Sequence, residues 1–209
     1  MTNVMDKLNE IKIIPVIAMN NAADAGPLAD ALVAGGLPCA EITFRTAAGA
    51  DAVKVMADRG GILVGAGTVL KVDQVKLAVD NGASFIVSPG FNPKVVKYCV
   101  DNGISITPGC SNPTDLEMAL DFDLEVVKFF PAEAFGGLKT LKAMSAPYNM
   151  LKFIPTGGIS PENILDYLRF DKIVACGGSW MVKSDLINGG KFDEIKTLTT
   201  EAVALLGNL

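Results

Sequence analysis

Histidine is absent from this chain of 209 residues. Its absence excludes histidine-based catalytic triads, imidazole proton shuttles and most zinc sites. Any acid–base chemistry must therefore use carboxylates, lysine, tyrosine or cysteine. Because no cysteine pair with metal-ligand spacing compensates for the missing imidazoles, we expect no metal site.

Cysteine is also scarce, with four residues at positions 39, 99, 110 and 176 and no Cys-x-x-Cys motif. Cys39 and Cys176 lie in apolar, strand-like segments, where cysteine usually acts as a small core residue. This usage is typical of a reduced protein, and we expect a cytoplasmic location.

No run of apolar residues is long enough to predict a transmembrane helix. The first ten residues lack the basic and then apolar layout of a signal peptide. A net charge of −5 argues against nucleic acid as a partner, because phosphate backbones require basic patches. With no linker or low-complexity tract, residues 1–209 are expected to form a single domain.

The chain does contain a regular series of apolar segments, each followed by a stretch with room for one helix and two short loops. We predict that these segments are eight strands: Ile13–Met19, Cys39–Phe44, Gly61–Gly67, Phe85–Gly90, Ile104–Gly109, Val126–Ala132, Leu151–Gly158 and Ile173–Ser179.

Helical spacing of apolar residues appears between these strands, for example at Val72, Val75 and Val79. Three dipeptides predict a helix N-cap followed by proline in the first turn: Asn92-Pro93, Asn112-Pro113 and Ser160-Pro161. We also expect a short helix within residues 2–10 and a last helix from about Phe192 to Leu206.

Eight consecutive βα units imply parallel strands with right-handed crossovers. An open doubly wound sheet of this size usually has a glycine-rich dinucleotide turn after its first strand, but here that strand ends in Ala18-Met-Asn-Asn21. We therefore predict an α/β fold, a (β/α)8 TIM barrel with a short N-terminal helix.

Lys128 is the one charged residue in the apolar segment Val126-Val-Lys-Phe-Phe130. A buried ammonium without a partner tends to lose its proton, and a neutral lysine can form a Schiff base with a carbonyl substrate. The alternative is a lysine that protects a sheet edge from aggregation. Strand alternation places Lys128 on the face opposite Val127 and Phe129, inside a barrel that has no edge.

The second strand carries Glu41, Thr43 and Arg45 on the face opposite Ile42 and Phe44. In a TIM barrel the active site lies at the C-terminal ends of the strands. A purely structural Glu41–Arg45 pair inside the barrel is the alternative, but burying such a pair is costly. We therefore interpret this face as part of a functional site.

Glycine motifs follow three strands. Gly65-Ala-Gly67-Thr68 offers glycines that let the backbone approach a ligand, although turns after strands often contain glycine. Pro155-Thr156-Gly157-Gly158 and Cys176-Gly177-Gly178-Ser179 follow strands seven and eight, the usual phosphate-binding strands of such barrels. A single Gly-Gly pair can be only a tight turn, whereas two at these positions favour a phosphate site.

Six segments occur in family-like order: Glu-Ile-Thr-Phe-Arg-Thr, Gly-Ala-Gly-Thr-Val, Ser-Pro-Gly, Val-Lys-Phe-Phe-Pro-Ala-Glu, Pro-Thr-Gly-Gly-Ile-Ser and Gly-Gly-Ser-Trp. Over nearly its whole length the chain resembles the class I aldolases of 2-keto-3-deoxy-6-phosphogluconate (KDPG) and 4-hydroxy-2-oxoglutarate (KHG). The resemblance implies that Lys128 forms the Schiff base and that Glu41 is the general acid/base. It further implies that Arg45 and Thr68 hold the pyruvate carboxylate, with Phe130 lining the pocket. Thr156, Gly157, Gly158, Gly178 and Ser179 match the phosphate end.

The implied reaction cleaves KDPG to pyruvate and glyceraldehyde 3-phosphate without a metal or organic cofactor. KHG as substrate, a homotrimeric state and a place in the Entner–Doudoroff pathway are further implications of the resemblance. The alternatives are another phosphate-binding barrel enzyme, such as an epimerase or a thiamine phosphate synthase, or a non-catalytic oligomeric barrel that binds sugar phosphates. The first does not need an inward lysine on strand six, and the second does not need Glu41 and Lys128.

Overall fold

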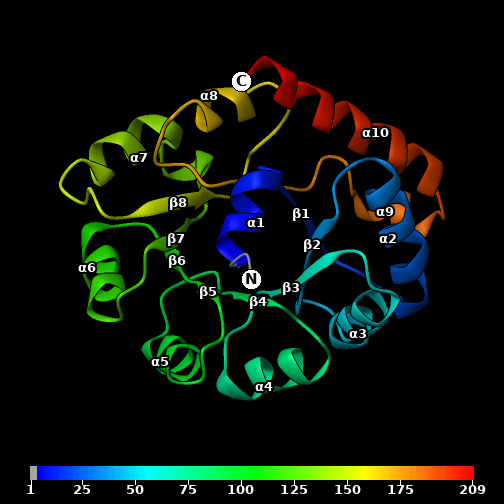
Figure 1. Ribbon diagram of the computed structural model, residues 1–209, viewed down its shortest axis with the longest axis horizontal. Coiled ribbons are helices and arrows are strands. Elements are labelled where there is room, and N and C mark those ends of the chain that lie inside the picture. Colours follow the sequence, from blue (N-terminus) through cyan, green and yellow to red (C-terminus); the bar gives the residue numbers. More distant parts are fainter. Residues whose placement is uncertain (1–3) are drawn as a thin grey trace.

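The computed structural model describes residues 4–209 as an α/β fold in which parallel strands alternate with helices (Figure 1). The strands are β1 (Ile13–Ile17), β2 (Cys39–Thr43), β3 (Leu63–Gly67), β4 (Phe85–Val87), β5 (Ile106–Thr107), β6 (Gly109–Cys110), β7 (Val126–Phe129), β8 (Lys152–Pro155) and β9 (Cys176–Gly178). Each predicted strand thus contains an observed one, but most predictions ran on into the loop that follows.

The α-helices are α1 (Val4–Ile11), α2 (Ala25–Ala34), α3 (Gly49–Arg59), α4 (Val72–Asp80), α5 (Pro93–Asp101), α6 (Pro113–Asp121), α7 (Gly137–Ser145), α8 (Ile164–Leu168), α9 (Ser184–Asn188) and α10 (Phe192–Leu205). Short 3-10 turns are η1 (Ala22–Asp24), η2 (Glu133–Phe135) and η3 (Leu206–Asn208). Helices α2 to α10 lie outside the strands, whereas α1 lies near the middle of the view (Figure 1). No helix within residues 4–209 is long and apolar enough to cross a membrane.

The predicted α/β fold with parallel strands is confirmed; the strands form two parallel sheets, and their closure into an eight-stranded barrel stays a prediction. One sheet has the order β5-β4-β3-β2-β1-β9 and the other has the order β6-β7-β8. Pro108 separates β5 from β6, because proline has no N–H to contribute to a strand ladder. Two isolated parallel bridges, Phe153↔Ile173 and Thr156↔Gly177, connect the β8 and β9 segments.

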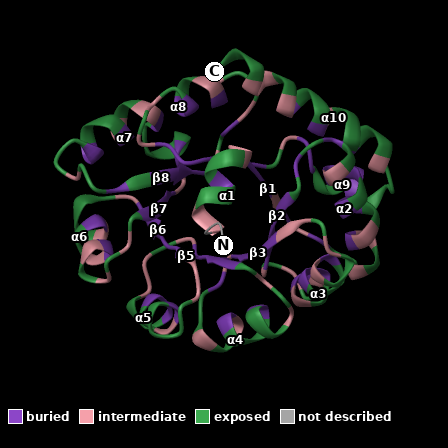
Figure 2. Ribbon diagram, viewed as in Figure 1, coloured by how far each residue is buried: buried purple, intermediate pink, exposed green. Residues whose placement is uncertain are grey.

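Strand alternation separates two apolar clusters. The larger one lies between strands and helices and includes Val127 and Phe129, as predicted for the outward face of β7. The smaller one contains Val126 together with Leu8 of α1, and also includes Ile14, Cys39, Phe85, Val87, Ile154, Val174 and Ala175. In Figure 2 the strands are largely buried and the outer faces of the helices are exposed. This inner cluster fills the end of the molecule near the strand N-termini.

The predicted helix starts at Asn92 and Asn112 are confirmed, because each asparagine side chain accepts a hydrogen bond from a backbone N–H of the first helical turn. The predicted start at Ser160-Pro161 is wrong, since α8 begins at Ile164. There, Asn163 accepts a hydrogen bond from Ser160 N–H and donates to Gly158 O, so residues 158–163 form a turn before the helix.

Candidate active site

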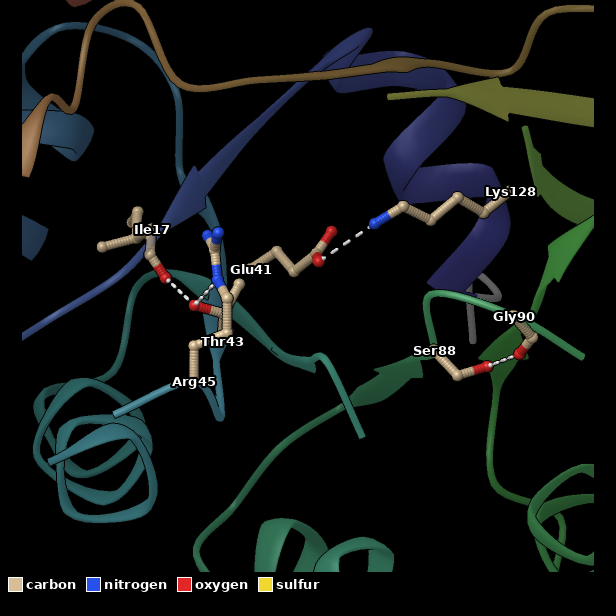
Figure 3. A network of polar contacts seen from close by, with 7 residues as sticks. All are labelled: Ile17, Glu41, Thr43, Arg45, Ser88, Gly90 and Lys128. Carbon is tan, nitrogen blue, oxygen red and sulfur yellow. Dashed lines mark hydrogen bonds and ion pairs between the residues drawn. The ribbon is translucent and has the colours of Figure 1, made fainter. Parts of the chain in front are cut away.

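Two buried charged side chains meet in the interior, above the small apolar cluster. Lys128 of β7 and Glu41 of β2 are only 6% and 3% exposed. Lys128 Nζ lies 3.4 Å from Glu41 Oε1, and Figure 3 shows the two side chains pointing toward one another from different strands. Lys128 Nζ also lies 5.2 Å from the centre of the Phe130 ring. The predicted inward orientation of both residues is therefore confirmed, and a carboxylate is placed beside the amine.

Gly67 makes room for this ion pair. A Cβ atom at Gly67 would lie 2.2 Å from Glu41 Oε1, so that only glycine leaves space for the carboxylate in its present position. A Cβ at Gly65 would lie 2.3 Å from the Phe85 ring. The glycines of this segment therefore accommodate side chains of neighbouring strands, and their predicted role in letting the backbone approach a ligand stays a prediction.

Arg45 does not pair with Glu41. Its Nε donates a hydrogen bond of 3.2 Å to Thr43 Oγ1, and the Thr43 hydroxyl in turn donates to Ile17 O at 2.8 Å (Figure 3). Arg45 is largely exposed, whereas Thr43 is buried. The alternative of an interior Glu41–Arg45 pair is therefore not what forms, and Arg45 is held at the mouth of the strands.

Thr68 follows β3 and has a positive φ of 56°. A β-branched residue in this region of backbone space is a genuine outlier, and such strain clusters at functional sites. Thr68 is partly buried beside the end of β3.

A cavity of about 160 Å³ lies at the C-terminal ends of the strands. Its lining is Val16, Arg45, Phe130, Thr156, Gly157, Gly158, Ile159, Gly177, Gly178 and Ser179. Seven of these residues are predicted site residues, and Phe130 connects the cavity to Lys128. Thr156 Oγ1 is buried and has no hydrogen-bond partner among the described residues, so it is free to receive one from a ligand.

Two residues of this lining were missed from the sequence, Val16 and Ile159. Gly177 was predicted as part of the second glycine pair, although it was not among the residues matched to the phosphate end. Val16 and Ile159 are ordinary aliphatic residues, and no pattern around them indicates a binding site. A larger cavity of about 350 Å³ lies beside α1 at the other end of the strands and contains none of the predicted site residues.

The Gly157–Gly158 turn adopts a conformation that favours glycine, with φ values of +99° and +80°. A Cβ at Gly158 would lie 2.6 Å from the Cβ and Cγ atoms of Glu133, and one at Gly178 would lie 2.0 Å from the Trp180 ring. These glycines are therefore required by close packing from behind as well as by the cavity in front.

Behind this turn, Tyr167 of α8 donates a hydrogen bond from its hydroxyl to Glu133 Oε1. Burial, followed by the hydrogen bond to Glu133, raises the pKa of Tyr167. The hydroxyl therefore keeps its proton and remains a donor at neutral pH.

Cysteine and acidic side chains provide no obvious metal centre. Within residues 4–209 no group of three or more histidine, cysteine, aspartate or glutamate side chains is placed to hold an ion. All four cysteines are buried and free, and burial raises the pKa of the Cys99 thiol to about 12.

Comparison with known proteins matches this arrangement to a family. The model of the KDPG and KHG aldolase family matches residues 4–198. The chain belongs to this family. It is 52% identical over 204 residues to the 2-dehydro-3-deoxy-phosphogluconate aldolase of Haemophilus influenzae, which covers 97% of this chain and 96% of the relative.

Solved structures of KDPG aldolases share the fold of this family member. The enzyme of Zymomonas mobilis, crystallised with 3-phosphoglycerate, superposes with a TM-score of 0.89 at 39% identity, covering 97% of this chain and 96% of that one. The enzyme of Legionella pneumophila, with pyruvate captured as a covalent carbinolamine intermediate, has a TM-score of 0.90 at 34% identity and covers 94% and 97%. The chain therefore belongs to a family of lyases.

Proposed function

We propose that this aldolase cleaves KDPG to pyruvate and glyceraldehyde 3-phosphate through a Schiff base on Lys128. The observation that carries the proposal is the buried Lys128–Glu41 pair, at 3.4 Å, next to a cavity lined by two glycine turns. The relatives from H. influenzae and Z. mobilis, both KDPG aldolases, support the choice of substrate.

The chemistry requires a neutral amine and a group that moves protons. Glu41 accepts a proton from Lys128, whose amine then attacks the C2 ketone of the substrate. Glu41 then gives the proton that it took from Lys128 to the carbinolamine hydroxyl, which leaves as water; a protonated imine forms and Glu41 is a carboxylate again. Glu41 next takes the proton of the C4 hydroxyl, directly or through a water, the C3–C4 bond breaks, and its electrons move to the imine to form an enamine. Protonation of the enamine at C3 and hydrolysis of the imine release pyruvate and restore Lys128.

The remaining site residues bind the two ends of the substrate. Arg45 and Thr68 hold the carboxylate, and Phe130 lines the wall between Lys128 and the cavity. At the far end Thr156, Gly157, Gly158, Gly178 and Ser179 receive the phosphate, through backbone N–H groups and hydroxyls. The position of Phe130 supports this assignment of a carboxylate end and a phosphate end, because its ring contacts Lys128 and also lines the cavity.

Five broader statements belong to the same proposal. Residues 1–209 form one aldolase domain, and the sheet β6-β7-β8 closes the sheet β5-β4-β3-β2-β1-β9 into an eight-stranded barrel, with β5 and β6 counted as one strand; this is supported by the bridges between the β8 and β9 segments and by the direct succession of β5 and β6. The active protein is a homotrimer, as the family resemblance implies. It works in the cytoplasm, in the Entner–Doudoroff branch of carbohydrate metabolism.

Cleavage of KHG to pyruvate and glyoxylate is the second candidate activity. The matching family includes KHG aldolases, and the Lys128–Glu41 pair acts on the ketone end, which both substrates share. The two substrates differ at their other end, which is the end that the glycine turns would contact.

Borohydride reduction in the presence of pyruvate, followed by peptide mapping, tests the mechanism. We expect a stable adduct on Lys128 alone, because it is the lysine that is buried beside a carboxylate at the cavity. Lys152 of the neighbouring strand β8, which is exposed, serves as the internal control. Labelling spread over several lysines, or none, would overturn the Schiff-base assignment.

A further inference from the structure

The Gly157–Gly158 turn lies at the proposed phosphate end of the cavity, and both of its carbonyl oxygens accept hydrogen bonds from other parts of the protein. Asn163 Nδ2 donates a hydrogen bond of 2.9 Å to Gly158 O, and Glu133 N–H donates one of 3.0 Å to Gly157 O. Two consecutive glycines lose much conformational entropy when they are ordered, so external bonds of this kind decide whether the turn is preformed.

Glu133 supports the turn with its side chain as well. The Gly158 position and the Glu133 side chain are so close that a Cβ at Gly158 would lie 2.6 Å from Glu133 Cβ and Cγ. The carboxyl group extends past Gly137, where a Cβ would lie 2.8 Å from Glu133 Oε1 and 3.1 Å from Tyr167 Oη. The aliphatic part of Glu133 thus packs behind the turn, and its carboxyl end reaches α8.

Tyr167 fixes the far end of this side chain. Its own side chain is 1% exposed, and its hydroxyl donates to Glu133 Oε1. Glu133 itself is exposed and follows β7 in the short turn η2, where a long side chain would otherwise sample several rotamers. The buried tyrosine therefore selects the Glu133 rotamer that packs against Gly158.

We infer that Glu133 and Tyr167 are positioning residues that hold the Gly157–Gly158 turn ready for the substrate phosphate, and that they thereby set the preference for phosphorylated over unphosphorylated 2-keto-3-deoxy acids. The inference rests on the proposed function. Neither residue lines the cavity, so both act through the turn and not on the substrate.

The test compares Tyr167→Phe with wild type, using KDPG and its unphosphorylated analogue as substrates and inorganic phosphate as a competitive inhibitor. We expect the ratio of kcat/KM for the two substrates to fall by about tenfold, through KM, as fits the loss of one hydrogen bond to a charged group that orders a binding turn. The inhibition constant for phosphate should rise by a similar factor. Tyr148→Phe is the control, because Tyr148 also donates a hydrogen bond to a glutamate, Glu117, at 3.2 Å, on the surface and outside the cavity lining.

Glu133→Gln provides the conservative rescue, since an amide oxygen can still accept from Tyr167, whereas Glu133→Ala removes both the acceptor and the packing. We expect Gln to retain most of the preference and Ala to lose it. A fall in thermal stability with equal losses for both substrates would show a merely structural role and overturn the inference. A wild-type enzyme with no preference for KDPG would overturn the phosphate end of the proposed function, and the inference with it. A wild-type preference that all variants keep would overturn the inference alone.

Discussion

Gly67→Ala changes the position of Glu41, the proposed general base, without changing any group that is proposed to take part in the reaction. The added Cβ would lie 2.2 Å from Glu41 Oε1 and 2.8 Å from Glu41 Cγ and Cδ. Gly67 has no positive φ, so its backbone accepts alanine. The new methyl group would therefore clash with the Glu41 side chain, which is buried and has little room to move.

The expected magnitude follows from this distance. An ordinary contact requires a separation of roughly 3.5 Å, so Glu41 Oε1 must retreat by about 1 Å from its present place. A misplacement of about 1 Å can reduce a rate by about 100-fold. Glu41→Gln, which removes the proton acceptor, should reduce turnover by about 100- to 10,000-fold. For Gly67→Ala we expect a loss of turnover near the lower end of that range. The double variant Gly67→Ala with Glu41→Gln should lose little more turnover than Glu41→Gln alone, because both changes act on the same group.

The assay is kcat for pyruvate release from KDPG, measured beside thermal unfolding and borohydride trapping of pyruvate on Lys128. Trapping should persist in Gly67→Ala at a reduced rate, which shows that the fold and the amine remain. Gly26→Ala is the matched control, since no atom lies within 4 Å of the added Cβ and the position is helical. A Gly67→Ala enzyme with wild-type kcat would refute the argument that the position of Glu41 controls turnover.

Two further predictions concern burial. The thiols should resist alkylation in the native protein at pH 8 and react after unfolding in guanidinium; a pKa of about 12 at Cys99 leaves only about one thiol in 10,000 ionised, and rapid native labelling would contradict the buried arrangement. Lys128→Met should lower the free energy of unfolding by about 3–5 kcal/mol because it leaves Glu41 without its partner, whereas Lys128→Met combined with Glu41→Leu should unfold at or above the wild-type denaturant midpoint. A double variant that is less stable than the single one would contradict this account.

The orientation of the site residues was predictable because it depends on local periodicity. Alternation along β7 placed Lys128 opposite Val127 and Phe129, and the structure confirms this face. The same rule oriented Glu41 correctly. Predictions of this kind need only the pleat of a single strand and the knowledge of which face is apolar.

The partners of these residues could not be predicted, because they depend on contacts between distant parts of the chain. Glu41 meets Lys128 across 87 positions, whereas Arg45, on the same strand face as Glu41, bonds to Thr43 instead. Gly67 reads as an ordinary turn glycine until the side chain that it accommodates is seen. The limit of the fifth predicted strand failed for a local reason, since Pro108 has no N–H for the ladder and divides Ile106–Thr107 from Gly109–Cys110.

Lys128 follows Val126 by two residues on β7 and faces the same side of the strand, so the Lys128–Glu41 pair lies next to the apolar cluster that contains Val126. The same alternation that places Val126 among apolar neighbours near the closed end places Lys128 nearer the open end. Transfer of two charges out of water costs several kcal/mol per ion, and an N–O separation of 3.4 Å recovers only part of it. Apolar residues at both positions would extend the inner cluster toward the cavity and stabilise the fold. The interior therefore keeps an arrangement that is unfavourable for folding at the level where, in the proposed Schiff-base mechanism, a carbonyl carbon and a proton acceptor meet.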